Sequence, residues 1–97
     1  MPAHLRLVIA QQVAALPEPA RLALRRMAAL GRAVPFDRLL DRLVGAGQPP
    51  DSVVDALETS CRYGLLDETR TGYRFRFPLI HELLVAGLGP HRRRLWA

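Results

Sequence analysis

The sequence has a single cysteine and no lysine. Because Cys61 stands alone, no disulfide can form within the chain, and the three histidines lack the spacing of metal ligands. No apolar run approaches the length of a membrane span, and Gln11 and Gln12 interrupt the N-terminal apolar segment where a secretory signal would be uniformly apolar. We therefore expect a cytoplasmic protein with no metal, no cofactor and no membrane contact.

The composition is that of one small globular domain. The chain has 97 residues, of which 49% are hydrophobic and 24% charged, and this excludes the composition of a disordered chain. All fourteen basic residues are arginines, and they give a net charge of +5. A basic balance is compatible with nucleic acid, with an acidic partner or with phosphate groups, and it does not choose among them.

Two helices are predicted in the first third of the chain. Residues 5–16 form one apolar stripe at helical spacing, and Pro17 interrupts it. A second helix is predicted from Pro19, a residue favoured in the first turn, to a stop at Gly31. The residues expected to face inward are Leu5, Ile9, Val13 and Leu16 in the first helix and Ala20, Leu24, Met27 and Ala28 in the second.

Two further helices are predicted in the middle of the chain. The third begins at Pro35 and ends at Gly45, with apolar residues at i, i+3, i+4, i+7 and i+8. The fourth begins near Asp51 or Ser52, where Ser52 and Asp55 have the spacing of a capping box, and ends at Gly64. The expected inward residues are Phe36, Leu39, Leu40, Leu43 and Val44 in the third helix and Val54, Leu57 and Cys61 in the fourth.

After Gly64 the pattern changes to that of strands. Residues 65–67 and 73–77 are short strand-like runs joined by residues 68–72, which predicts a hairpin. Its inward side is expected to hold Tyr73, Phe75 and Phe77, with Arg74 and Arg76 outward. Residues 78–88 then predict a fifth helix, and residues 91–97 follow it.

This order of elements predicts a mainly α winged-helix fold. The second, third and fourth helices form a three-helix core, the two-stranded hairpin is the wing, and N- and C-terminal helices flank them. Residues 1–17 are expected to be an N-terminal helix, from a preceding lid-like subdomain, and residues 18–97 the winged-helix domain. If the N-terminal helix does not dock on the core, its apolar residues are exposed and favour self-association.

No constellation of catalytic residues is visible, and neither is a phosphate-binding glycine loop, so we expect no enzyme activity. Cys61 is expected to be a structural thiol, because it lies on the apolar side of the fourth helix. His81 is expected to be an ordinary surface histidine.

Arginines form the densest positive patches. They are Arg70, Arg74 and Arg76 on the wing and Arg92, Arg93 and Arg94 near the end of the sequence, and they are candidates for contacts with phosphates or a partner. The fourth helix, which reads the major groove in winged-helix DNA-binding proteins, instead has Asp51, Asp55 and Glu58 outward. These carboxylates would repel phosphates. The wing arginines could equally form a solvated strand face, with cross-strand pairs to Asp67 or Glu68.

Residues 14–21, 28–31, 64–66, 73–82 and 91–95 resemble the region after the ATPase core in bacterial STAND-type transcriptional regulators of the SARP and LuxR types. The resemblance implies a winged-helix domain that packs on a nucleotide-binding domain and helps to hold its ADP-bound resting state. It also implies that DNA binding belongs to a separate domain.

The chain departs from this family at two positions. The family's Phe-Arg-His-Pro-Leu pattern reads Phe-Arg-Phe-Pro-Leu in residues 75–79, so Phe77 replaces the nucleotide-sensing histidine. A phenyl ring neither donates a hydrogen bond nor carries charge, which argues against direct nucleotide sensing. Trp96 stands where the family usually has histidine.

The function that these patterns favour is a non-catalytic regulatory module that controls the on/off state of a nucleotide-binding domain, in the same chain or in another. Its expected interface combines Arg70, Arg74 and Phe77 with the fifth helix. The alternative is a stand-alone winged-helix DNA-binding regulator that uses the wing and residues 92–94. A third reading is an interaction adaptor without a ligand.

Overall fold

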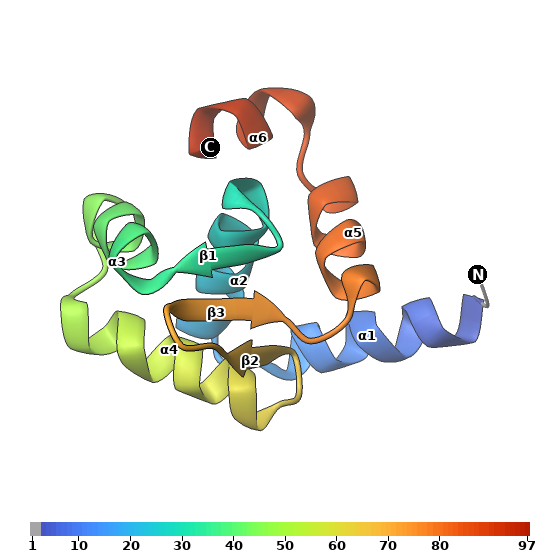
Figure 1. The fold of residues 1–97 in the computed structure, drawn as a ribbon. Coiled ribbons are helices and arrows are strands. Elements are labelled where there is room, and N and C mark those ends of the chain that lie inside the picture. Colours follow the sequence, from blue (N-terminus) through green and yellow to red (C-terminus); the bar gives the residue numbers. More distant parts are fainter. Residues whose placement is uncertain (1–2) are drawn as a thin grey trace.

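The computed structural model describes residues 3–97, which form a mainly helical domain with a small antiparallel sheet (Figure 1). The elements in chain order are α1 (Ala3–Ala15), α2 (Glu18–Leu30), β1 (Ala33–Pro35), α3 (Phe36–Gly45), α4 (Pro50–Arg62), β2 (Leu66–Glu68), β3 (Gly72–Phe75), α5 (Pro78–Gly87) and α6 (Pro90–Trp96). The strands are ordered β1-β3-β2. Within this part of the chain, no helix combines the length and the apolarity needed to cross a bilayer.

α2 is the centre of the helical packing, and it contacts α3, α4, α5 and α6. Its four predicted inward residues are buried, which confirms the predicted face, and Ala23 is buried with them. The bounds of α2 are also close to the prediction. Pro19 lies in the first turn, where its missing N–H removes no hydrogen bond, and Gly31 follows the last residue.

α4 faces the core with a different set of residues than predicted. Val53, Ala56, Leu57 and Ser60 are buried, whereas Val54 and Cys61 are only half-buried. The sequence pattern missed Ser60 because it is polar, yet its hydroxyl donates a hydrogen bond to the Ala56 carbonyl oxygen over 2.8 Å. That bond satisfies the hydroxyl in the interior, so a serine can occupy a core position.

The two ends of α4 give opposite outcomes for the prediction. The prediction of a capping box at Ser52 and Asp55 was wrong, because the helix begins at Pro50 and no side chain caps its N-terminus. The stop at Gly64 is confirmed, since this glycine has φ +77° and the Leu65 N–H donates to the Ser60 carbonyl over 3.0 Å. A left-handed glycine with that hydrogen bond is the usual way to end a helix.

In α3, Leu39 and Leu43 are fully buried, while Phe36 and Leu40 are half-buried against the core. Val44 was predicted to face inward, and it is 39% exposed. It follows the fully buried Leu43, with which the buried side of α3 ends.

The sheet contains β1, which the sequence pattern did not predict. β1 pairs antiparallel with β3, and Val34, which is buried, lies opposite Tyr73. Gly72, opposite Pro35 in the register, has no room for a side chain. A Cβ on this residue would fall on the Val34 carbonyl oxygen and would lie 2.6 Å from the Phe36 backbone nitrogen. The third strand therefore depends on a missing side chain.

β2 and β3 form the predicted hairpin, with Leu66 opposite Phe75 and Glu68 opposite Tyr73. Tyr73 and Phe75 are buried as predicted, but Phe77 is 56% exposed, so the prediction that it faces inward was wrong. β3 ends at Phe75, and the alternation between the two faces of a strand ends with it.

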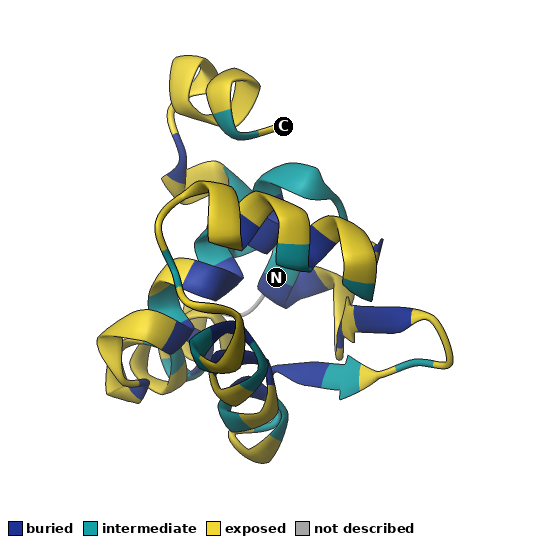
Figure 2. Cartoon of the chain, turned by 90° about the vertical axis from the view of Figure 1, so that its left-hand side faces the viewer, coloured by how far each residue is buried: buried dark blue, intermediate teal, exposed yellow. Residues whose placement is uncertain are grey.

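α1 docks on this core through Ile9 and Leu16, which are buried, and through Val13, which is half-buried. The Arg21 guanidinium of α2 donates to the Leu16 carbonyl oxygen over 2.8 Å, and so satisfies a carbonyl just beyond the end of α1. Leu5 was predicted to face inward but is 45% exposed. Figure 2 shows that the buried residues lie on the sides of the elements that face the interior of the domain. α6 has no buried residue.

Candidate interaction surfaces

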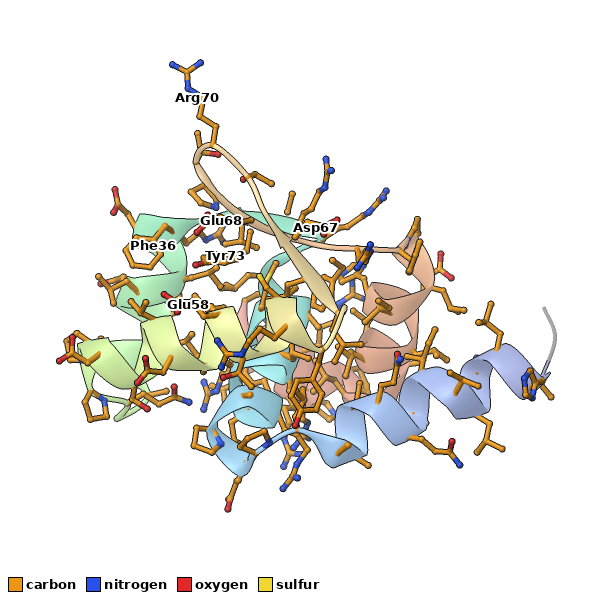
Figure 3. All side chains as sticks on the ribbon, turned by 90° about the horizontal axis from the view of Figure 1, so that it is seen from below. Phe36, Glu58, Asp67, Glu68, Arg70 and Tyr73 are labelled. Atoms are coloured by element: carbon orange, nitrogen blue, oxygen red, sulfur yellow. The ribbon has the colours of Figure 1, made fainter. Side chains whose placement is uncertain are left out.

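One surface of the domain is acidic. Asp51, Asp55 and Glu58 are exposed on α4 as predicted, and Glu68 is exposed on the neighbouring strand β2. Between α4 and the hairpin lies a hollow of about 560 Å³, whose lining includes Glu58, Glu68 and Tyr73 (Figure 3). In a winged-helix DNA reader this surface would meet phosphates, and its carboxylates oppose that contact.

The neighbouring carboxylates affect the pKa values of Tyr73 and Cys61. The Tyr73 hydroxyl donates to Glu68 Oε1 over 3.3 Å. Burial, and then the Glu68 carboxylate, raise the pKa of Tyr73 to about 12 from the ordinary 10.0. Burial, and then Glu68 and Asp67, likewise raise the pKa of the Cys61 thiol. Both groups are therefore held in their neutral forms, which is the reverse of what a reactive thiolate requires.

The predicted wing arginines are all exposed, but they do not gather at one place. Arg70 lies in the turn of the hairpin and points away from the domain (Figure 3). Arg74 lies opposite Asp67 in the register of β2 and β3, as a cross-strand pair requires. The Arg76 guanidinium lies 5.9 Å from the centre of the Phe77 ring, where the chain leaves the sheet. The structure thus separates Arg70 from Phe77 by the length of β3.

One arginine of α6 and two of α2 lie around the ring of Trp96. Arg92, Arg93 and Arg94 are exposed, and the Arg92 guanidinium carbon lies 5.6 Å from the centre of the Trp96 ring. From α2, the guanidinium carbons of Arg26 and Arg25 lie 4.0 Å and 5.6 Å from the same ring centre. The sequence reasoning missed Arg25 and Arg26. The only available signal was the i, i+4 spacing of Arg92 and Trp96, which places both on one face of a helix.

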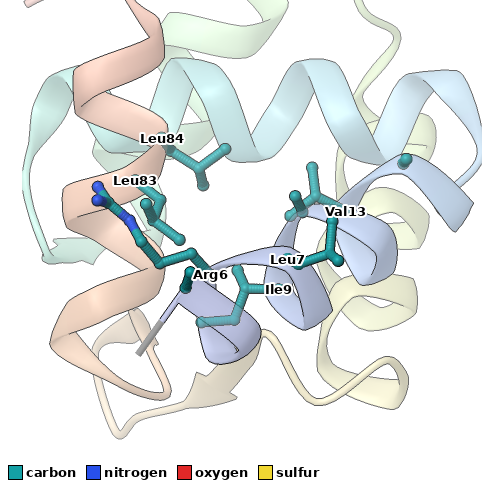
Figure 4. A pocket seen from close by; sticks show the side chains of 9 residues that line it. Arg6, Leu7, Ile9, Val13, Leu83 and Leu84 are labelled. Atoms are coloured by element: carbon teal, nitrogen blue, oxygen red, sulfur yellow. The ribbon is translucent and has the colours of Figure 1, made fainter. Parts of the chain in front are cut away.

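An apolar groove of about 620 Å³ runs between α1 and α5, and Figure 4 shows Leu7, Leu83 and Leu84 along it. A smaller hollow of about 380 Å³ adjoins it, since both are lined by Ile9, and this second hollow includes Phe77. The exposed Phe77 and Leu7 therefore belong to one largely apolar surface, which we call the α1–α5 face. Continuous exposed apolar surface of this kind marks sites of protein contact.

His81 is not the surface histidine that was expected. Its Nε2 lies 3.1 Å from the Ala28 carbonyl oxygen, and its ring packs 5.4 Å from the ring of Phe75. It joins α5 to α2 and to the sheet and is half-buried. In the part of the chain that the structure covers, no group of three or more His, Cys, Asp or Glu side chains is placed to hold a metal ion.

Comparisons of the chain with protein families, with characterised proteins and with solved structures gave no match.

Proposed function

We propose that the domain is a winged helix that acts as a non-catalytic regulatory module. The order helix, strand, helix, helix and two-stranded hairpin, from α2 to β3, supports this fold, because it is the order of a winged helix. The added strand β1 supports it further, since it ties the hairpin to the helical core.

The module works by contact with another protein domain and not by reading DNA bases. In this fold α4 would be the recognition helix, and its exposed Asp51, Asp55 and Glu58 oppose a phosphate-lined groove. Of the side chains that bond a base edge at two points, Arg, Lys, Asn and Gln, α4 has only Arg62, in the last turn.

The observation that carries the proposal is the exposure of Phe77. It stands where the resembling family has a nucleotide-sensing histidine, it is 56% exposed, and it is part of the apolar α1–α5 face. A phenyl ring at this place supplies apolar contact where the histidine would supply a hydrogen bond. The partner that suits it is the apolar surface of a cytoplasmic nucleotide-binding domain, in the same polypeptide or in another.

The mechanism is a shift of population. When the module is docked, it favours the closed, ADP-bound state of the partner, and when it is released, the open state is favoured. The module shifts this equilibrium only by the difference between its binding free energies for the two states. A surface variant therefore affects regulation only if it changes that difference.

The test is the release of a fluorescent ADP analogue from a nucleotide-binding domain encoded in the same or a neighbouring gene. Adding the module is expected to slow release, and Leu7→Ser and Phe77→Ser are expected to abolish the effect. Leu22→Ser, which changes an exposed leucine on α2, is the matched control. A module that neither binds this domain nor changes the release rate would overturn the proposal.

A further inference from the structure

Five arginines lie on α2 and α6, two helices that contact each other, and three of the five surround Trp96. Arg25 and Arg26 come from α2, and Arg92, Arg93 and Arg94 come from α6, which carries no acidic residue. We call this set the α2–α6 arginine surface. The adjoining hollow, of about 450 Å³, adds Arg42 and a single carboxylate, Asp41.

The ring of Trp96 contacts three of these arginines. Its ring has Arg26 at 4.0 Å, Arg25 at 5.6 Å and Arg92 at 5.6 Å. A cation is attracted to the face of an indole ring within about 6 Å of its centre. The ring therefore holds three like charges together before any ligand arrives, and less side-chain freedom is lost when one binds.

The positive charge is least balanced at the α6 end of the domain. α6 lies at one end, and α4 and β2 lie at the other (Figure 1). The α4 and β2 end carries both signs, because Glu58, Asp67 and Glu68, labelled in Figure 3, are accompanied by the exposed Arg62 and Arg74. A polyanion is therefore attracted most strongly to the α6 end.

Phosphate is the chemistry that this surface fits. The planar guanidinium group matches the geometry of phosphate oxygens and can bond two of them at once. The five arginines are spread over two helices, so they fit a ligand with repeated phosphates better than a single phosphate group. Binding to an anionic membrane would also require apolar side chains that insert into it. On α6 only Leu95, which is 80% exposed, could do so, since the Trp96 ring is covered by arginine.

We propose that the α2–α6 arginine surface binds the phosphate backbone of double-stranded nucleic acid without reading its bases. The contact uses neither α4 nor the hairpin, so it differs from the docking of a winged-helix DNA reader. It is also independent of the proposed regulatory function, which uses the α1–α5 face.

Trp96 is the only tryptophan in the chain, so its fluorescence reports directly on this surface. The experiment titrates the protein with a mixed-sequence duplex of about 20 base pairs and follows that fluorescence. For three to five phosphate contacts, the affinity is expected to fall about 50- to 500-fold when the salt is raised from about 50 mM to about 200 mM. Duplexes of different sequence are expected to bind equally well. An unchanged Trp96 signal at the lower salt would overturn the proposal.

A pair of variants with the same loss of charge locates the contact. Arg92→Gln is expected to weaken binding about three- to tenfold and to lower the slope of affinity against salt by about one. Arg70→Gln, at the turn of the hairpin, is expected to leave binding unchanged. Equal losses in the two variants, or a larger loss in Arg70→Gln, would contradict the proposal.

Trp96→Leu keeps all five arginines and removes the ring that holds three of them together, so a labelled duplex followed by anisotropy is expected to bind more weakly at unchanged net charge. Affinity equal to that of the wild type would refute the role of Trp96. Vesicles that contain phosphatidylglycerol form the last arm. A Trp96 response to vesicles without one to the duplex would overturn the proposal in favour of a membrane.

Discussion

Gly72 of β3 lies opposite Pro35 of the neighbouring strand β1, and replacing it with alanine adds one methyl group between the two strands. The new Cβ would fall on the Val34 carbonyl oxygen and would lie 2.6 Å from the Phe36 backbone nitrogen and 2.8 Å from the Pro35 carbonyl carbon. All three atoms belong to the backbone, so no side chain can rotate away to make room. The strands must move apart.

The size of the effect follows from what this separation breaks. Val34 is 3% exposed, and exposing it costs about 1.5 to 3 kcal/mol. The hydrogen bond from the Phe36 N–H to the Thr71 carbonyl oxygen, 2.9 Å long, contributes about 0.5 to 1.5 kcal/mol. Alanine also lowers the conformational entropy of the unfolded chain, which offsets this loss by about 0.4 to 1 kcal/mol. We therefore expect Gly72→Ala to lower the free energy of unfolding by about 1 to 4 kcal/mol, a large part of the stability of a small domain.

Urea unfolding followed by far-UV circular dichroism measures this difference. Gly87→Ala is the matched control, because a Cβ on Gly87, the last residue of α5, meets nothing within 4 Å. It is expected to leave stability unchanged or to raise it by up to about 1 kcal/mol. If Gly72→Ala cost less than about 1 kcal/mol, the close approach of β1 and β3 would be refuted.

Four further outcomes are expected. Leu39→Ala, in the core of α3, should cost about 2 to 5 kcal/mol of unfolding free energy in urea, and a cost near zero would contradict the register of that helix. Phe77→Ala should cost less than about 1 kcal/mol in the same assay, since the ring is mostly exposed, and a larger loss would mean that it packs in the core. Stability should fall as the pH rises from about 10 to about 12, because the pKa of Tyr73 is higher in the folded state than in the unfolded one; Tyr73→Phe should remove that part of the loss, and an unchanged alkaline profile would refute the assignment. Iodoacetamide should modify Cys61 slowly at mildly alkaline pH and faster in Glu68→Gln, and equal rates would show that the carboxylate does not act on the thiol.

The helices could be predicted from the sequence because local chemistry sets their limits. Pro19 can begin a helix, and Gly31 and Gly64 can end one, whatever the rest of the chain does. The inward face of α2 was equally legible, since its apolar residues repeat at helical spacing. α4 was harder because Ser60, a buried residue, is polar, and only a hydrogen bond seen in the structure explains its place.

The parts that could not be predicted depend on residues far apart in the sequence. β1 is three residues long and contains Pro35, and it becomes a strand only because β3 supplies its partner and Gly72 leaves room for it. The α2–α6 arginine surface joins two helices that are separated by most of the chain. The exposure of Phe77 depends on where β3 stops, which sequence alternation does not record.

The Arg21 hydrogen bond at the end of α1 has a mechanical consequence. Only residues 16 and 17 separate α1 from α2. The Arg21 guanidinium donates a hydrogen bond to the Leu16 carbonyl oxygen, and this restricts rotation of α1 relative to α2. With thirteen residues, α1 is about 20 Å long. Arg21 holds its C-terminal end, and the buried Ile9 holds it to the core farther along. We therefore expect α1 and α2 to move as one body when a partner binds α1.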